Sequence, residues 1–358
     1  MWKDLDISLE KATDLKPRPS GEKLGFGQYF TDHMFRMDWN RKDGWHSARI
    51  CPYQPFSMDP ASTVLHYGQA IFEGLKAYRS GDDRLLLFRP EDNFKRMNDG
   101  AVRMSMPRFS VDQVLKALKA LVYLDRDWIP TAEGASLYLR PTMIGVDPFL
   151  GLKPASTYIF YIIMSPVGAY YSEGFSPTRI YVCRDYVRAV KGGVGNVKTA
   201  GNYAASMLAA EKAKEAGYTQ VLWLDACERK YIEEVGTSNI FFFINDTVIT
   251  PPLSGSILGG ITRDSVIQLL RSWDIAVEER QISIDEVIAA SQDGSLKESF
   301  ATGTAAVISP VGELFYDDVS HLVNNGQTGP LSVRIFEELQ AIQFGRTEDR
   351  FGWTVTVC

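Results

Sequence analysis

Hydrophobic and polar positions along the chain follow two different periods. Short apolar runs rich in β-branched and aromatic residues, bounded by turn residues, predict strands. These runs cover residues 85–90, 137–140, 158–164, 180–183, 221–224, 240–244 and 248–250. Apolar residues at helical spacing predict helices over residues 91–104, 111–123 and 202–216, and a further helix that begins within residues 258–262. The mixture of strands and helices indicates an α/β (α+β) protein.

A stretch rich in glycine, proline, serine and tyrosine interrupts this pattern between Ser165 and Pro177. Such a composition is typical of a connection between folded parts. A chain of 358 residues suggests about two domains, each large enough to bury its own core. We therefore expect a small N-terminal α/β domain over residues 1–167, a connection over 168–179 and a large C-terminal domain over 180–358.

Composition and charge exclude several classes of function. A net charge of -6 argues against a nucleic-acid partner or an anionic membrane surface. No run of 18 apolar residues is present, and the N-terminus lacks the regions of a signal peptide, so we expect a cytoplasmic protein. The scattered cysteines form no CxxC pair and the histidines no metal-binding spacing, which predicts reduced thiols and no metal.

Residues 192–203 place a single lysine, Lys198, in a glycine-rich turn. Three interpretations compete. A nucleotide-binding P-loop requires glycine directly before the lysine, where this chain has Val197. An ordinary surface lysine is the common case in a chain with 38 lysines and arginines. The third interpretation is a lysine that forms a Schiff base with pyridoxal phosphate.

That cofactor needs an amine, a countercharge for its pyridine nitrogen, a partner for its ring hydroxyl and an anion site for its phosphate. Tyr203 follows the lysine at the start of a predicted helix and could meet the hydroxyl. Glu233 and Glu234 precede a buried strand, where an unpaired charge is costly. Because side chains alternate along a strand, only one of them can face the ring. Residues 259–262 open a helix whose free N–H groups suit a phosphate.

The chain resembles the branched-chain amino-acid aminotransferases, which are pyridoxal-phosphate enzymes of fold type IV, and it is more similar to their eukaryotic-type subgroup. The resemblance runs over nearly the whole chain. It is carried by residues 30–34, 65–69, 72–77, 137–141, 166–170, 201–203, 234–239 and 303–306. One departure is that Ala306 and Ser309 replace the CxxC redox pair of some relatives, which excludes a thiol switch there.

The resemblance implies a two-domain fold with the cofactor at the domain interface. Lys198 would form the Schiff base and carry the proton between the substrate and the cofactor. Glu234 would pair with the pyridine nitrogen and Tyr203 with the ring hydroxyl. The remaining cofactor contacts implied by the resemblance are Arg96, Ile261, Thr262, Gly303 and Thr304 around the phosphate, Leu258 on the ring and Thr237 beneath it.

The resemblance also implies a substrate pocket and a reaction. The amino group of L-leucine, L-isoleucine or L-valine would pass by a ping-pong route to 2-oxoglutarate. Arg140 would hold the distal carboxylate of glutamate, and Tyr67 and Leu152 would reach in from the other subunit of a homodimer. The other implied substrate contacts are Phe26, Phe72, Tyr138, Tyr170, Thr237, Thr304 and Ala305.

Other interpretations of these residues stay open at this point. By position alone, Arg96 could be an exposed helix charge, and Phe72 and Tyr138 could be core aromatics. A D-amino-acid aminotransferase or an aminodeoxychorismate lyase would share Lys198 and Glu234. Both families are typically shorter and lack the strand over residues 137–141. A nucleotide-binding protein built on the Lys198 turn is the alternative from another class.

Overall fold

The computed structural model describes residues 7–19, 24–168 and 175–357. The chain divides into two compact units. The first unit holds residues 1–170, 197–200 and 340–358, and the second holds residues 171–196 and 201–339. Two of these segments, 197–200 and 340–358, lie in the part of the chain for which the sequence pattern suggested a single C-terminal domain.

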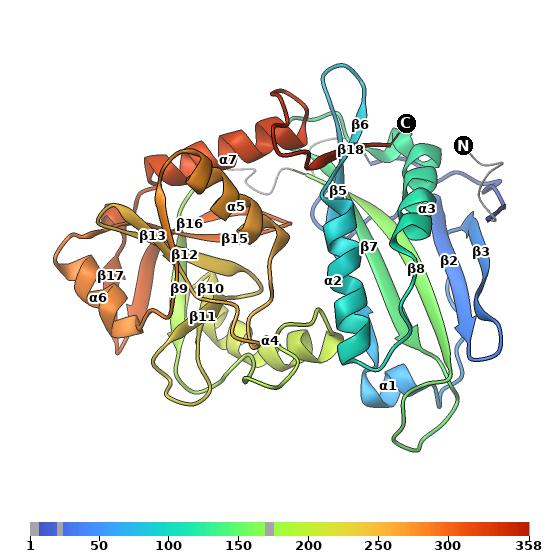
Figure 1. Cartoon of the computed structure of the whole chain (residues 1–358), viewed down its shortest axis with the longest axis horizontal. Coiled ribbons are helices and arrows are strands. Elements are labelled where there is room, and N and C mark those ends of the chain that lie inside the picture. The colour runs from blue at the N-terminus through green and yellow to red at the C-terminus, as the bar shows by residue number, and fades with distance from the viewer. Residues whose placement is uncertain (1–6, 20–23, 169–174, 358) are drawn as a thin grey trace. The chain divides into compact units, whose positions relative to one another are not determined.

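The first unit is built on a nine-stranded sheet (Figure 1). Its main path runs β1-β3-β2-β8-β7-β5-β6-β18, and β4 pairs with β7. Its strands are β1 (Ser8–Leu9), β2 (His33–Asn40), β3 (Gly44–Pro52), β4 (Ala70–Phe72), β5 (Leu75–Arg79), β6 (Leu85–Phe88), β7 (Ser136–Gly145), β8 (Thr157–Val167) and β18 (Thr354–Thr356). Its helices are α1 (Thr63–Tyr67), α2 (Pro90–Arg103), α3 (Val111–Leu124) and the short η1 (Arg126–Trp128).

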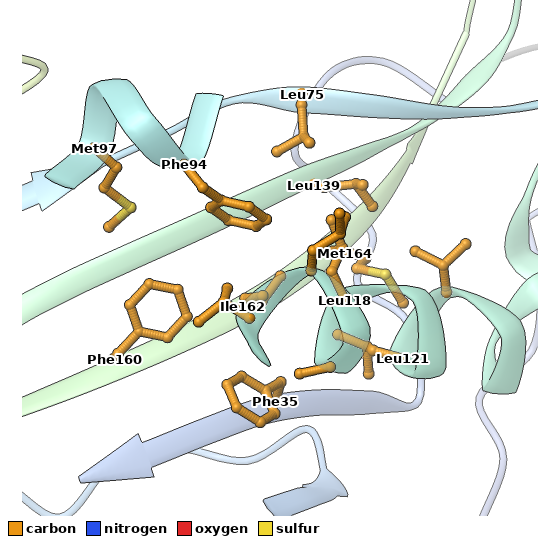
Figure 2. Close-up of a cluster of buried hydrophobic side chains, with 14 of the residues drawn as sticks. Phe35, Leu75, Phe94, Met97, Leu118, Leu121, Leu139, Phe160, Ile162 and Met164 are labelled. Atoms are coloured by element: carbon orange, nitrogen blue, oxygen red, sulfur yellow. The ribbon is translucent and has the colours of Figure 1, made fainter. Parts of the chain in front are cut away.

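Helices α2 and α3 cover one face of this sheet, as the sequence periodicity predicted (Figure 1). Pro90 opens α2, where its missing N–H costs nothing, and the Ser110 hydroxyl accepts from the Gln113 N–H to cap α3. Apolar side chains of both helices pack onto β2, β5, β7 and β8. Figure 2 shows Phe35, Leu75, Phe94, Met97, Leu118, Leu121, Leu139, Phe160, Ile162 and Met164 in this core.

Hydrogen bonds explain why the two later segments belong to the first unit. The Phe72 N–H donates to the Lys198 carbonyl at 3.0 Å, and the Thr199 hydroxyl donates to the Ala70 carbonyl at 2.8 Å. These bonds align residues 198–199 with β4. At one end of the sheet's main path, β18 pairs antiparallel with β6. Such long-range pairing leaves no mark on local hydrophobic periodicity.

The second unit contains another nine-stranded sheet, whose path runs β11-β10-β9-β16-β15-β12-β13-β14, with β17 on β16. The strands are β9 (Thr178–Cys183), β10 (Gln220–Leu224), β11 (Ile232–Val235), β12 (Asn239–Ile244), β13 (Thr247–Thr250), β14 (Ala276–Glu279), β15 (Leu296–Gly303), β16 (Val307–Tyr316) and β17 (Val319–Leu322). The helices are α4 (Ala200–Glu215), α5 (Ile261–Ser272), α6 (Ile284–Gln292), the short η2 (Asn324–Gly326) and α7 (Pro330–Gln343), whose last residues belong to the first unit.

Helix α4 lies against β9 and β10 through Ala209 and Ala213, which pack with Trp223. It ends where the sequence predicted. Gly217 has a φ of +87°, and the Tyr218 N–H reaches back to the Ala213 carbonyl at 2.9 Å. No helix within residues 7–19, 24–168 and 175–357 is long and apolar enough to cross a membrane.

Candidate active site

Lys198 lies in the first unit beside the end of β4. Its main chain is held by Phe72, and its Nζ lies 5.1 Å from the centroid of the Phe72 ring. Burial lowers the pKa of the Lys198 amine, and the nearby charges of Glu73 and Arg96 act in opposite directions on it. An amine with a lowered pKa is neutral over a wider range of pH, as a nucleophile or a proton acceptor must be.

A buried ion pair lies near this lysine. The Glu73 side chain is fully buried, and Arg96 of α2 donates to both of its oxygens, from Nε at 2.8 Å and from Nη2 at 2.7 Å. The pair identifies Arg96 as more than an exposed helix charge. The role of Glu73 was missed in the sequence, although it stands between Phe72 and Gly74 in a conspicuously apolar stretch.

Aromatic rings and one guanidinium form the rest of the first-unit site. Arg140 donates from Nη2 to the Tyr138 hydroxyl at 2.9 Å, and its Cζ lies 4.7 Å from the Phe72 ring centroid. The rings of Phe26 and Tyr138 meet edge to face with centroids 4.8 Å apart. Among the described residues, the buried Nε of Arg140 has no hydrogen-bond acceptor. One N–H of this guanidinium therefore remains available to a ligand oxygen.

Gly74 makes room for this arrangement. A Cβ at Gly74 would lie 2.0 Å from the Tyr138 hydroxyl oxygen, so a larger residue would displace the phenol. The structure thus brings four predicted substrate contacts together with Lys198 in one unit. They are Phe26, Phe72, Tyr138 and Arg140.

The two residues expected to reach a partner subunit lie on the surface of the first unit. Tyr67 is exposed at the end of α1 and donates from its hydroxyl to the Leu150 carbonyl. Leu152 is 85% exposed, and Leu150 beside it is 62% exposed. Tyr170, the remaining predicted substrate contact of this part of the chain, lies outside the described residues.

In the second unit, Glu234 lies on β11 with its side chain buried. One oxygen, Oε2, is 2.6 Å from Nη1 of Arg188, and the other, Oε1, accepts from the Asn239 amide at 3.3 Å. The neighbouring Glu233 is half-buried and bonded by the Ser256 hydroxyl, and burial raises the pKa of its carboxyl. The two carboxylates therefore have different partners and different surroundings, as strand alternation predicts.

Asn239 also connects Glu234 to the start of α5. Its amide donates to the Leu258 carbonyl at 2.8 Å. A Cβ at Gly260 would lie 2.0 Å from the Asn239 Oδ1, so the chain can pass there only as glycine. Gly260 precedes Ile261 and supplies no side-chain cap to the helix. The first N–H groups of α5 form the kind of helix terminus that binds phosphate.

The remaining predicted residues lie on turns of the second unit or at its helix ends. Tyr203 is half-buried in the first turn of α4, and Thr237 is exposed in the turn between β11 and β12. A Cβ at Gly303, the last residue of β15, would lie 3.0 Å from the Ser238 hydroxyl oxygen. The turn between β11 and β12 therefore adjoins the turn that follows β15. The half-buried Thr304 and Ala305 lie in the latter turn.

Contacts within the protein fix the conformation of the glycine-rich segment before Lys198. Gly192 has a φ of +85°, and a Cβ at Gly195 would lie 2.1 Å from the Ser256 carbonyl oxygen. Glycines in such a turn allow close approach to a bound group, but at Gly195 the close neighbour is the chain's own backbone. Arg188 donates to the Gly195 and Ser256 carbonyls at 3.1 and 3.0 Å. Arg188 was also missed, because no motif in the sequence marks it.

Each unit, taken by itself, contains groups that pyridoxal phosphate requires. The first has an amine with a lowered pKa, and the second has a buried carboxylate, a phenol and a helix N-terminus. Among residues 7–19, 24–168 and 175–357, no cluster of histidine, cysteine, aspartate or glutamate could hold a metal ion.

Comparisons with known proteins agree in fold and in sequence. The family described as amino-transferase class IV matches residues 70–314. The branched-chain-amino-acid aminotransferase 2 of Bacillus subtilis (strain 168) is 56% identical over 98% of this chain and 97% of its own length. A crystal structure of the Escherichia coli branched-chain amino acid aminotransferase superposes with a TM-score of 0.76 at 28% identity, covering 91% of this chain and 99% of that one. The branched-chain amino acid aminotransferase of Thermobaculum terrenum, in its PLP-form, gives a TM-score of 0.75 at 25% identity, with coverage of 91% and 98%.

Proposed function

The chain belongs to the amino-transferase class IV family, and from that premise we propose that it is a branched-chain-amino-acid aminotransferase. It moves the amino group of L-leucine, L-isoleucine or L-valine to 2-oxoglutarate, reversibly and in two half-reactions. The observation that carries the proposal is the amine of Lys198, with its lowered pKa, beside Phe72 and the Arg140 guanidinium.

We propose that the residues of both units serve one pyridoxal phosphate. When bound, the cofactor supplies an electron-poor ring that stabilises the negative charge developing at the substrate Cα. Glu234 would hold the ring nitrogen and Tyr203 the ring hydroxyl, and Leu258 and Thr237 would contact the ring. The phosphate would be held by Arg96, by the N–H groups of Ile261 and Thr262, and by the turn of Gly303 and Thr304.

Lys198 moves the proton of the reaction. In its neutral form, its Nζ would accept the proton from the substrate Cα and hold it until it is passed on. The lowered pKa of this amine favours the neutral form that accepts the proton. Glu73 contributes at a distance, because its two hydrogen bonds fix the guanidinium of Arg96.

The aromatic cage explains how one pocket takes two kinds of side chain. Phe26, Phe72 and Tyr138 bury a branched side chain, which gains about 25 cal/mol for each Å² removed from water. The acidic side chain of glutamate instead reaches the Nε of Arg140. When leucine is bound, the contacts of Arg140 with Tyr138 and Phe72 compensate part of its charge. Apolar pockets discriminate by only about 1–3 kcal/mol per methylene, so all three branched substrates are accepted.

The enzyme acts as a homodimer in this proposal. The exposed apolar side chains of Leu150 and Leu152, together with Tyr67, form the surface that meets the second copy. We also assign Thr304 and Ala305 to substrate binding. The cysteines that the structure describes, Cys51, Cys183 and Cys227, are free thiols, which suits a cytoplasmic enzyme.

The test is a substrate comparison with the purified, cofactor-loaded protein. L-leucine with 2-oxoglutarate should give glutamate and the branched 2-oxo acid, and D-alanine should give no product. Turnover of D-alanine with none of L-leucine would identify a D-amino-acid aminotransferase instead. Release of pyruvate from aminodeoxychorismate would identify the lyase.

A further inference from the structure

Arg188 and Glu234 form an ion pair inside the second unit. Nη1 of Arg188 lies 2.6 Å from Oε2 of Glu234, and their side chains are only 7% and 2% exposed. A pair that is this well buried is screened little by solvent or salt. It also carries a large desolvation cost, which must be offset by good geometry and further hydrogen bonds.

The surroundings of the pair supply those hydrogen bonds. The Asn239 amide lies 3.3 Å from the second oxygen of Glu234, so both carboxylate oxygens have a donor or a cation beside them. The guanidinium of Arg188 also donates to the carbonyls of Gly195 and Ser256. An arginine is charged at every physiological pH and presents its donors in a rigid plane. A carboxylate beside it retains its charge although it is buried.

We propose that Arg188 is a positioning residue for the reaction: it keeps the Glu234 carboxylate charged and turned so that it can hold a proton on the ring nitrogen of the cofactor. This inference rests on the proposed function. A neutral Glu234 could not retain that proton, and the ring would then withdraw less charge from the substrate. Arg188 touches neither the substrate nor the reacting atoms in this scheme and acts only through Glu234.

A second carboxylate lies within the influence of Arg188. Its charge lowers the pKa of Glu233, although burial of that carboxyl is the larger effect and raises the pKa. Glu233 is already bonded by the Ser256 hydroxyl, whereas Glu234 lies in direct contact with the guanidinium. The effect of Arg188 on the cofactor should therefore pass through Glu234, and this can be tested by removing the charge of each carboxylate separately.

The experiment is a double-mutant cycle on the full chain. Apoprotein of the wild type, Arg188→Met, Glu234→Gln and the double variant is titrated with pyridoxal phosphate, and the absorbance band of the bound cofactor is recorded across pH. In the wild-type background, Arg188→Met should weaken cofactor binding about 30-fold or more, as truncation of one partner of a buried charge pair does. In the Glu234→Gln background the same change should cost less than about threefold, because the acid through which it acts is no longer charged.

Two further variants separate positioning from stability. Arg188→Lys keeps the charge but loses the planar set of donors, so it should bind the cofactor less tightly than the wild type and at least about fivefold more tightly than Arg188→Met. Arg263→Met removes another buried arginine of the same unit, one that pairs with Glu279 at 3.0 Å, and should lower the melting temperature of the apoprotein without moving the band. Glu233→Gln should leave the effect of Arg188→Met intact.

Different results of this experiment would contradict the role of Arg188 and the proposed function. Equal losses from Arg188→Met in both backgrounds, or an Arg188→Lys variant as impaired as Arg188→Met, would overturn the inference and make Arg188 a structural residue. If Arg188→Met does not fold, the Arg188→Lys variant decides alone. A wild-type protein that binds no pyridoxal phosphate would instead contradict the proposed function, which is a separate result.

Discussion

Arg96 and Glu73 meet through two parallel hydrogen bonds, at 2.8 and 2.7 Å, although 23 positions separate them in the chain. The geometry is a two-pronged arginine–carboxylate pair, which fixes the guanidinium plane more strictly than a single contact could. Because Glu73 is fully buried and Arg96 is 15% exposed, the carboxylate lies behind the guanidinium, away from solvent. Glu73 thereby orients the residue that we assign to the cofactor phosphate.

Glu73→Gln should weaken both the fold and cofactor binding. The change leaves a buried guanidinium without its countercharge, which costs about 3 kcal/mol of unfolding free energy. Urea unfolding of the apoprotein and titration with pyridoxal phosphate would measure the two effects. Glu91→Gln is the control on the same helix, because its pair with Lys95 is exposed and is worth less than about 1 kcal/mol. Equal effects of the two changes would contradict the positioning role of Glu73.

Lys198→Ala should remove transamination and the absorbance band of the lysine-bound cofactor. We assign to this residue both the covalent attachment of the cofactor and the proton transfer, so we expect turnover to fall by at least about 10⁴-fold. Lys191→Ala changes an exposed lysine directly before the glycine-rich turn and should retain activity. A Lys198→Ala enzyme that transaminates L-leucine at nearly the wild-type rate would refute the assignment.

Arg140→Met should impair the half-reaction with glutamate more than the half-reaction with leucine. The change removes the N–H that we assign to the distal carboxylate of glutamate, and a hydrogen bond to a charged group contributes about 1.5–3 kcal/mol. We expect kcat/KM for L-glutamate to fall at least about tenfold more than kcat/KM for L-leucine. Tyr138→Phe removes the neighbouring hydroxyl and leaves the guanidinium charge, so its effect on the glutamate reaction should be smaller. Equal losses with both substrates in Arg140→Met would show that the arginine is not selective.

The buried amine of Lys76 should make the free energy of unfolding depend on pH. It lies opposite Tyr138 in the pairing of β5 with β7, and burial lowers its pKa to about 8 from 10.5. Below pH 8 the folded protein carries the full cost of burying this ammonium group. Between about pH 8 and 10.5 the unfolded chain holds a proton that the folded chain has lost, so the stability contributed by this residue rises with pH.

Lys76→Met should therefore raise the free energy of unfolding by about 2–3 kcal/mol at pH 7. The difference from the wild type should shrink as the pH approaches 10.5, where the amine is neutral in both states. Urea unfolding of the two proteins at pH 7 and pH 10 would measure it. A gain that is the same at both pH values would show that packing, and not charge burial, accounts for the effect.

Several elements of the fold could be predicted because their signals are local. Helices α2, α3 and α4 begin and end within a few residues of the predicted bounds, and proline, serine and glycine mark their ends. The strands β6 to β10 likewise follow from their apolar runs. The family was also identified correctly from the motifs, as the match over residues 70–314 confirms.

The sequence by itself determined several of the elements and the family, and it singled out Lys198 as the candidate, because periodicity, capping and motif spacing act over a few residues. Only the tertiary structure decided which buried charged side chains pair with the residues that the motifs mark. Glu73 beside Arg96 and Arg188 beside Glu234 are joined across 23 and 46 positions. Nor does any local pattern say that residues 198–199 align with β4 or that β18 pairs with β6. Burial and charge pairing are properties of the folded chain, since a carboxylate acquires its partner only when distant segments come together and exclude water.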